Sequence, residues 1–328
     1  MMRANDLQSG RNARHQYNIT PAEVCFPLEP KLLKSGELAK HQPKRPKPKF
    51  NTKSVTRVSG SLPKDGLMWG AAKETATYAV ENREWRGMPD EMAIETLRTR
   101  FRYLWDIKAE TGTIVHEVAM LWAQEKDADI AEMLAFDRYG KERKWTPDET
   151  AEVLRRVDGC LISLEKFYKI YKPEWRFVER TVINPGATWR LGMPYKVDTA
   201  TCYAGQFDAV AYLKGVGWVL LDHKTGQRYL DAMTLQLAGL AHAPLLGTYD
   251  AEGHLILTEP FEAPRKRAVV FLNDSGEFEY LELPAGRRAY QRFIALRRNI
   301  DWLDEITQFE KDHPSPFNGE EELQKVAA

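Results

Sequence analysis

Two runs of alternating apolar and polar residues stand out in the second half of the chain. Residues 207–213 and 218–224 flank a glycine-containing turn, and this pattern predicts an antiparallel β-hairpin. Successive side chains on a strand point to opposite faces, so Asp222 and Lys224 project to the same side. A three-residue turn sets Asp208 opposite Asp222. The hairpin therefore gathers two acids and a lysine at one end.

Helical periodicity precedes and follows this hairpin. Helices are predicted over residues 69–82, 90–108, 113–124, 147–171, 231–242 and 286–309, and further strands over residues 176–183, 267–272 and 277–283. Thr146 and Glu149 around Pro147 are typical of a helix start. Helical spacing also predicts a core stripe formed by Leu97, Phe101, Leu104 and Trp105. This order predicts an α/β fold, a mixed central sheet flanked by helices, with an added N-terminal helical region.

The ends of the chain differ in composition from its middle. Residues 1–50 include a cationic, proline-rich stretch at 41–49, and we expect a partly disordered extension and linker there. Residues 51–310 form the predicted main domain, with a helical insertion at about 90–172, and residues 311–328 form a tail. No apolar run approaches the ~18 residues of a membrane span, and no signal-peptide segment is present, so we expect a soluble, cytoplasmic protein with no membrane partner.

Charge must be considered locally in this chain. Its 47 basic and 47 acidic residues cancel, which excludes a protein that coats nucleic acid with its whole surface. Three basic clusters are candidates for phosphate contacts: Arg98, Arg100 and Arg102; Arg265, Lys266 and Arg267; and Arg297 and Arg298. A solvated face is the more common alternative for each. No Walker A sequence is present, so motor activity would require a partner.

The acids of the hairpin suggest metal chemistry. Facing carboxylates on neighbouring strands repel each other, so sheet stability does not explain the pair Asp208 and Asp222. A divalent cation between them removes the repulsion, and Mg²⁺ and Mn²⁺ prefer oxygen ligands such as these carboxylates and the backbone carbonyl of His223. Lys224 beside the metal can orient or deprotonate water, or neutralise phosphate charge. A solvated strand end is the alternative, but the strand is apolar on both faces and should be buried.

Two residues upstream are further candidate metal ligands. Glu179 lies in the middle of the predicted strand 176–183, and His116 lies at the margin of the apolar stripe of the predicted helix 113–124. Helical side chains lean toward the N-terminus, so His116 should lie over the turn that begins at Gly112, where glycine leaves space. A water-facing glutamate and a structural histidine are the common alternatives when such residues stand alone.

Taken in order, these residues resemble the motifs of a nuclease superfamily. The set comprises Gly112-x-x-x-His116, Glu179, Gly205-x-x-Asp208, Asp222-x-Lys224 and Gln236. It resembles the RecB-type branch of the PD-(D/E)XK nucleases, and is also similar to phage-encoded exonucleases identified as CRISPR-associated RecB-like. Residues 54–58 and the following Leu67, Met68 and Trp69 are similar to the opening segment of those proteins. The resemblance covers residues 54–283.

The resemblance implies a restriction-endonuclease-like core and a role for each motif. The implied ligands of one or two Mg²⁺ or Mn²⁺ ions are His116, Glu179, Asp208 and Asp222. Lys224 would be catalytic, and Gln236 would help to position Lys224 or the phosphate. The implied function is an exonuclease on linear DNA in phage or bacterial DNA recombination, repair or replication, with a recombination or annealing protein as a candidate partner. A structure-specific endonuclease and a catalytically silent DNA- or protein-binding member of the fold are the alternatives.

The chain also departs from the family pattern. Asp222 stands where many relatives have glutamate, and Leu240 stands where the family often has tyrosine. The iron–sulfur subset of the family uses four cysteines, whereas this chain has only Cys25, Cys160 and Cys202, so no iron–sulfur cluster is expected. These cysteines are widely separated and lack Cys-x-x-Cys pairing, which predicts buried or free thiols without structural disulfides.

Overall fold

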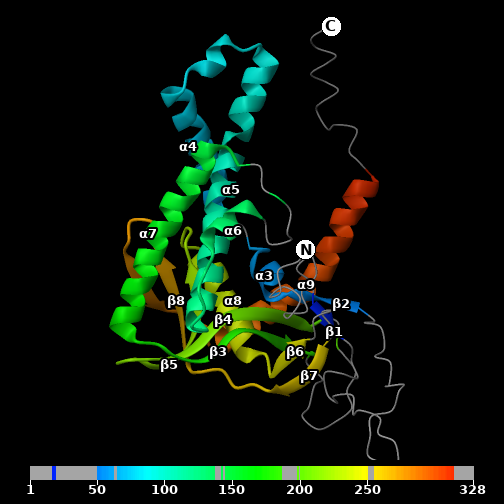
Figure 1. Ribbon diagram of the computed structural model, residues 1–328. Helices are drawn as coiled ribbons and strands as arrows, with labels where there is room; N and C mark the ends of the chain where they lie inside the picture. The colour runs from blue at the N-terminus through cyan, green and yellow to red at the C-terminus, as the bar shows by residue number, and fades with distance from the viewer. Residues whose placement is uncertain are drawn as a thin grey trace, which may run out of the picture.

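A mixed β-sheet lies at the centre of the structure, a computed structural model that describes residues 17–19, 50–62, 65–136, 142, 145–186, 198, 200–249 and 255–313 (Figure 1). The nine strands in this part of the chain are β1 (Tyr17–Ile19), β2 (Phe50–Ser54), β3 (Glu174–Asn184), β4 (Tyr203–Leu213), β5 (Gly217–Lys224), β6 (Leu245–Tyr249), β7 (Leu255–Pro260), β8 (Lys266–Leu272) and β9 (Phe278–Glu282). Their order is β7-β6-β3-β4-β5-β8-β9, with β2 beside β4 and β1 beside β2. The pairs β5–β8 and β2–β4 are parallel and the others are antiparallel.

The predicted hairpin is formed by β4 and β5. A turn of three residues, 214–216, joins the strands. Their register pairs Ala209 with Leu221, so one step further along the strands Asp208 comes opposite Asp222, as the sequence predicts. Because β5 pairs only with the second half of β4, the first residues of β4 are free to pair with β2.

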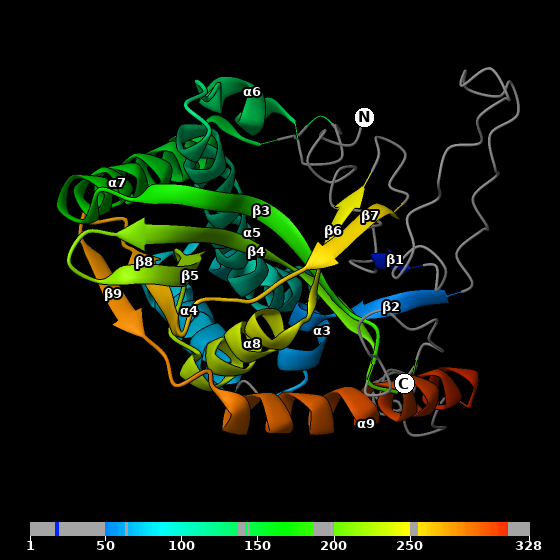
Figure 2. The same cartoon turned by 90° about the horizontal axis from the view of Figure 1, so that it is seen from below.

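Helices cover both faces of the sheet, as Figure 2 shows from below. One layer contains α5 (Asp90–Ala123), α6 (Ile130–Ala135) and α7 (Pro147–Tyr171), and the other contains α3 (Val55–Ser59), α8 (Leu230–His242) and α9 (Arg287–Asp312). On β5, the buried side chains of Val219 and Leu221 pack with the first layer, whereas buried Leu220 packs with the second. The strand β5 is apolar on both faces because it lies in the middle layer of an α/β/α core, with helices on both sides of the sheet as predicted.

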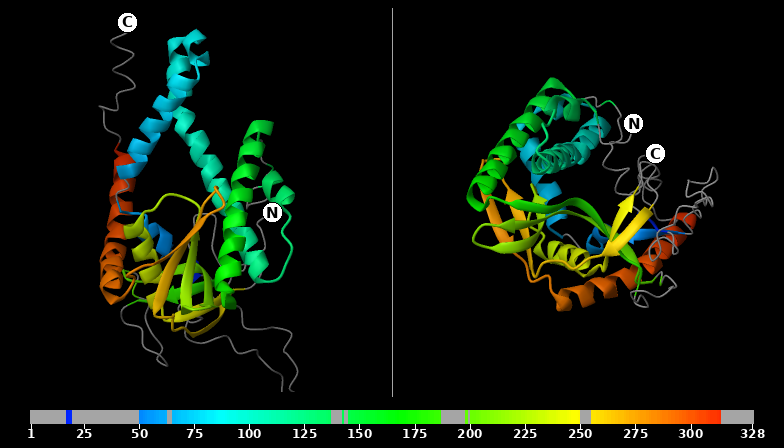
Figure 3. Two further views of the ribbon diagram at one scale, coloured as in Figure 1. Left: turned by 90° about the vertical axis from the view of Figure 1, so that its left-hand side faces the viewer. Right: turned by 60° about the horizontal axis from the view of Figure 1, so that its bottom comes forward.

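A helical arm projects away from this core. The arm consists of α4 (Asp65–Glu81), the short helix η1 (Glu84–Gly87) and the first half of α5, and Figure 3 shows it rising beyond the sheet. Arg100 of α5 links the two long helices of the arm, α4 and α5. Its guanidinium carbon lies 4.5 Å from the ring centre of Tyr78 in α4 and 4.2 Å from that of Tyr103 in α5. The stripe predicted as core is only half-buried, since this part of α5 packs on α4 beyond the sheet; its members are Leu97, Phe101, Leu104 and Trp105.

The other predicted elements are present with shifted ends, and two differences are informative. The helices predicted at 90–108 and 113–124 are one 34-residue helix, α5, because buried contacts continue through Ile107 and Ile114 on either side of Gly112. The strands β6 and β7 had no clear alternation and were not predicted. Most of the predicted N-terminal extension and the tail after residue 313 lie outside the described residues. Of the helices that the structure describes, none combines the length and apolar character needed to cross a membrane.

Helix α7 begins with the cap that its sequence predicts. Thr146 Oγ1 accepts a hydrogen bond from the Glu149 N–H at 3.3 Å, and the Glu149 carboxylate accepts one from the Thr146 N–H. We expect Thr146→Ala to lower the free energy of unfolding by about 1 kcal/mol, because the first turn loses an acceptor for its unpaired N–H groups. Urea denaturation would measure the change. Thr146→Ser keeps the acceptor and should match the wild type; equal losses in both variants would contradict the capping role.

Candidate active site

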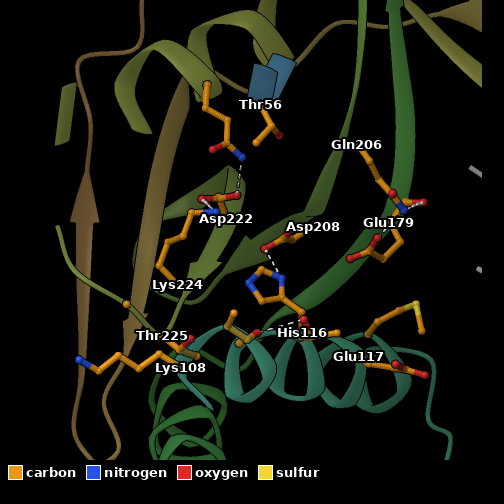
Figure 4. A pocket seen from close by; sticks show the side chains of 16 residues that line it. Thr56, Lys108, His116, Glu117, Glu179, Gln206, Asp208, Asp222, Lys224 and Thr225 are labelled. Carbon is orange, nitrogen blue, oxygen red and sulfur yellow. Dashed lines mark hydrogen bonds and ion pairs between the residues drawn. The ribbon is translucent and has the colours of Figure 1, made fainter. Parts of the chain in front are cut away.

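A pocket of about 450 Å³ opens between α5 and α8, beside the middle of β3 and β4 and the end of β5 (Figure 4). It brings together the candidate side chains named from the sequence: His116 of α5, Glu179 of β3, Asp208 of β4, Asp222 and Lys224 of β5, and Gln236 of α8. The sheet holds its acids side by side, and the two helix layers supply the histidine from one side and the glutamine from the other. The fold therefore assembles residues that are far apart in the sequence.

His116, Glu179 and Asp208 form a cluster that could hold a metal ion. One ligand atom of each residue lies within 4.8 Å of the others. The His116 Nδ1 atom lies 3.3 Å from Asp208 Oδ2. Two carboxylates suit Mg²⁺ and Mn²⁺, and an imidazole favours Mn²⁺. Three of the four predicted side-chain ligands are thus in one cluster, which is called the metal cluster below, and Asp222 lies beside it.

Asp208 is held in place by two histidines. Its Oδ2 accepts a hydrogen bond from the backbone N–H of His223 at 2.6 Å and lies 3.3 Å from the Nδ1 atoms of His116 and His223. Burial raises the pKa of Asp208, but the histidines lower it by more, so this pKa lies well below its usual value. Burial lowers the pKa of His116, and the carboxylate of Asp208 more than reverses that effect. Asp208 is therefore ionised at neutral pH, with the two histidines beside its Oδ2 atom.

Lys224, Asp222 and Gln236 form a second polar group beside the metal cluster. The Lys224 Nζ atom lies 2.6 Å from Asp222 Oδ2, and Gln236 Nε2 donates to Asp222 Oδ1 at 3.1 Å. Burial lowers the pKa of Lys224, but Asp222 and Asp208 raise it by more, whereas burial raises the pKa of Asp222 despite the nearby lysine. The Asp222 side chain is 3% exposed and that of Lys224 is 25% exposed. The lysine is therefore a protonated group at the wall of an open pocket.

Gln236 and His223 make contacts that the sequence did not predict. Gln236, expected to position Lys224 or the phosphate, donates instead to Asp222, the partner of Lys224. His223 was predicted to offer its backbone carbonyl to the metal, and this stays a prediction. Its observed role is to hold Asp208 through its N–H, while its buried ring lies 6.5 Å, centre to centre, from that of Phe167.

Glycines in the sequence motifs allow close packing around the pocket. A Cβ atom at Gly112 would lie 3.0 Å from the Thr225 hydroxyl oxygen, so glycine lets α5 approach the segment that follows Lys224. A Cβ atom at Gly205 would lie 2.7 Å from a methyl group of Val55 and 2.8 Å from one of Leu240. A side chain at Gly205 would force Val55 or Leu240 to move, whereas one at Gly112 would require only a small shift of the Thr225 side chain.

Sequence reasoning missed Gln206 and Lys108. Gln206 lines the pocket two residues before Asp208 and donates to the carboxylate of Glu179. It was overlooked because the predicted strand began at residue 207, whereas β4 begins earlier. Lys108 lines the pocket from α5, two turns before His116, and its Nζ atom lies 3.5 Å from Glu74 Oε1. The four-residue spacing of 108, 112 and 116 was the available signal.

The basic clusters do not form the wall of this pocket. Of the described residues that line it, none belongs to the three clusters. Arg297 is 3% exposed and donates to the carbonyl of Cys202 and to Asp301, so it fits neither the phosphate contact nor the solvated face considered for its cluster. Cys160 and Cys202 are buried free thiols, as predicted, and Cys25 lies outside the described residues.

The site thus has two adjoining parts with different chemistry. His116, Glu179 and Asp208 offer a set of cation ligands. Lys224 offers a positive charge fixed by Asp222 next to them. No protein-family model matches this chain and no curated protein is significantly similar to it, so the geometry of the pocket carries the functional argument.

Proposed function

We propose that this protein is a divalent-metal-dependent DNA nuclease that hydrolyses phosphodiester bonds, and that it acts as an exonuclease on linear DNA. The observation that carries the proposal is the metal cluster with the Lys224–Asp222 ion pair beside it in one open pocket. The proposal includes a restriction-endonuclease-like core of the RecB type, for which the order of motifs in the sequence is the support. The choice of an exonuclease rests on the same resemblance.

The donor set fits a hard divalent cation. His116, Glu179 and Asp208 would hold Mg²⁺ or Mn²⁺, and Asp222 lines the same pocket as a further carboxylate. The carboxylate of Asp208 is ionised and faces this pocket, so it offers the negative charge that a divalent cation requires. Such an ion, when bound, polarises a phosphoryl oxygen and makes water more acidic.

The residues of the chain supply position and charge. The ammonium group of Lys224 would orient the attacking water by a hydrogen bond or neutralise the charge that develops on the phosphate. Asp222 fixes this ammonium group, and Gln236 in turn fixes Asp222. In-line attack at phosphorus needs little covalent chemistry from the protein, so positioning and electrostatics would supply most of the rate.

The shape of the pocket supports a polymer as substrate. Cavities of about 390 Å³ and 350 Å³ adjoin it, the first sharing Glu179 and Gln206 and the second sharing Lys224 and Thr225. The three cavities therefore adjoin one another along the side chains that they share, and together they offer more room than one nucleotide needs. Lys108 lines the pocket as a second cation, suited to a phosphate near the scissile one. A nucleic-acid strand uses these adjoining cavities better than a single nucleotide does.

Cleavage assays with defined substrates test the proposal. Purified protein would be incubated with end-labelled linear duplex, single strands and closed circular DNA in Mg²⁺, Mn²⁺ or EDTA. We expect loss of linear DNA with either metal, none in EDTA, and intact closed circles. Cleavage of closed circles would establish an endonuclease instead. DNA binding without cleavage of any substrate would favour the silent binding member of the fold and overturn the proposed activity.

A further inference from the structure

Glu179 has an unusual backbone for a residue inside a strand. Its φ is 51°, in the left-handed region that favours glycine and asparagine over glutamate. The ladder to β4 keeps one register across this position, with Val178 paired to Ala209 and Arg180 paired to Phe207, and its register shift lies earlier, between Trp175 and Phe177. The local distortion therefore leaves the register unchanged, and it occurs at the position opposite Asp208. Such a conformation persists only where the surroundings enforce it.

Gln206 holds this residue at two points. Its Nε2 group donates a hydrogen bond to Glu179 Oε2 and contacts the Glu179 backbone carbonyl at 3.4 Å. Figure 4 shows the Gln206 amide directed at Glu179 and the glutamate turned toward the pocket that contains Asp208. Gln206 itself is fixed in β4, where it pairs with Thr181 of β3. One amide group therefore binds both the side chain and the backbone of the distorted residue.

We propose that Gln206 is a positioning residue that keeps the Glu179 carboxylate in the metal cluster by stabilising the left-handed backbone at Glu179. A regular strand conformation would turn this side chain differently relative to its neighbours, because side-chain direction on a strand follows from the backbone. The distortion and the two contacts from Gln206 together place the carboxylate within reach of His116 and Asp208. The inference rests on the proposed metal-dependent function of the pocket.

Calorimetric titration with Mn²⁺ alone tests the role of Gln206. Gln206→Met keeps the length of the side chain but removes the donor, and we expect Mn²⁺ to bind about 10–100-fold more weakly, as for other residues that orient metal ligands. Gln206→Asn is the second variant, because its shorter amide cannot reach the carboxylate. Gln308→Met is the matched control, since Gln308 of α9 lines none of the three cavities and donates a hydrogen bond to Asp312, and its Mn²⁺ affinity should equal that of the wild type.

Melting temperatures test the backbone part of the inference. Glu179→Asn and Glu179→Gln both remove the carboxylate, but asparagine tolerates the left-handed region better. We therefore expect both variants to lose Mn²⁺ affinity and Glu179→Asn to melt at the higher temperature. Equal melting temperatures would overturn the claim that the backbone at this position is strained.

The outcomes separate this inference from the proposed function. Wild-type Mn²⁺ affinity in both folded Gln206 variants would overturn the positioning role alone. A wild-type protein that binds no Mn²⁺ would overturn both the inference and the proposed function. Mn²⁺ binding that weakens in the Gln206 variants of a protein that cleaves no DNA would support the inference and remove the nuclease activity.

Discussion

Lys224→Met is expected to reduce metal-dependent DNA cleavage by about a thousandfold, with Mn²⁺ binding retained. The ammonium group is fixed 2.6 Å from Asp222 at the wall of the pocket. Among the described residues that line the pocket, no other one forms an ion pair with Asp222. Loss of a fixed electrostatic or proton-transfer group typically costs 10²–10⁴-fold in rate, which is about 3–5 kcal/mol of activation free energy. Single-turnover cleavage of end-labelled linear DNA would measure the change.

Controls must separate catalysis from stability. Lys224→Met leaves the buried carboxylate of Asp222 without its ion-pair partner, which costs up to about 3 kcal/mol of folding free energy. The double variant Asp222→Asn with Lys224→Met removes both charges and should recover part of this stability without recovering cleavage. Lys224→Arg keeps the charge in a different shape and should retain a small fraction of activity. Cleavage at the wild-type rate in folded Lys224→Met protein would exclude the lysine from the mechanism.

Asp208→Asn is expected to weaken Mn²⁺ binding by more than about 100-fold. Altering a residue that only orients a metal ligand costs about 10–100-fold in affinity, and this substitution changes a ligand itself. Asp208 is the acid at the centre of the metal cluster, because its Oδ2 atom contacts two histidines and accepts a backbone N–H. Asparagine keeps an oxygen that can accept the hydrogen bond from His223, so the fold should be preserved while the negative charge is lost. Calorimetric titration with Mn²⁺ would measure the loss of affinity.

Glu117→Gln provides the matched control for this measurement. Glu117 also lines the pocket, yet it lies outside the metal cluster. Its neutralisation changes the net charge of the pocket by the same amount, so Mn²⁺ affinity should fall only slightly. If Glu117→Gln and Asp208→Asn weakened binding equally, the cation would be held by the general negative charge of the pocket and the assigned ligand set would be wrong.

The sequence predicted the centre of the fold well because the centre has strong local signals. The run from 207 to 224 alternates regularly around a glycine turn, and its register follows from a turn of three residues. Thr146 and Glu149 mark the start of α7 by a cap that depends only on neighbouring residues. The strands β6 and β7 are short, and they join the sheet only because β6 pairs with β3, which is distant in the sequence, while β7 pairs with β6. Their local pattern therefore carried no clear signal.

The residues of the candidate site divide in the same way, into those with a local sequence signal and those whose role depends on contacts between distant segments. Asp208, Asp222 and Lys224 were visible because a buried strand that ends in charges is unusual. The contact of Gln236 with Asp222 depends on how α8 lies over β5, and no spacing in the chain encodes that. The distorted backbone at Glu179 is a tertiary effect at a residue whose own preference opposes it. Gln206 was missed because a strand boundary is the least certain part of a prediction from periodicity.

The continuity of α5 has a mechanical consequence. One helix of 34 residues carries both the distal end of the arm and His116 of the pocket. At about 1.5 Å per residue, roughly 39 Å of helix separate its first residue, Asp90, from His116. A tilt of α5 by only about 5° around His116 would displace the far end of the arm by roughly 3 Å. A small change of orientation at the metal cluster therefore corresponds to a larger displacement of the arm. The arm and His116 are therefore joined by unbroken helix, with no loop between them to absorb a change in the direction of the arm.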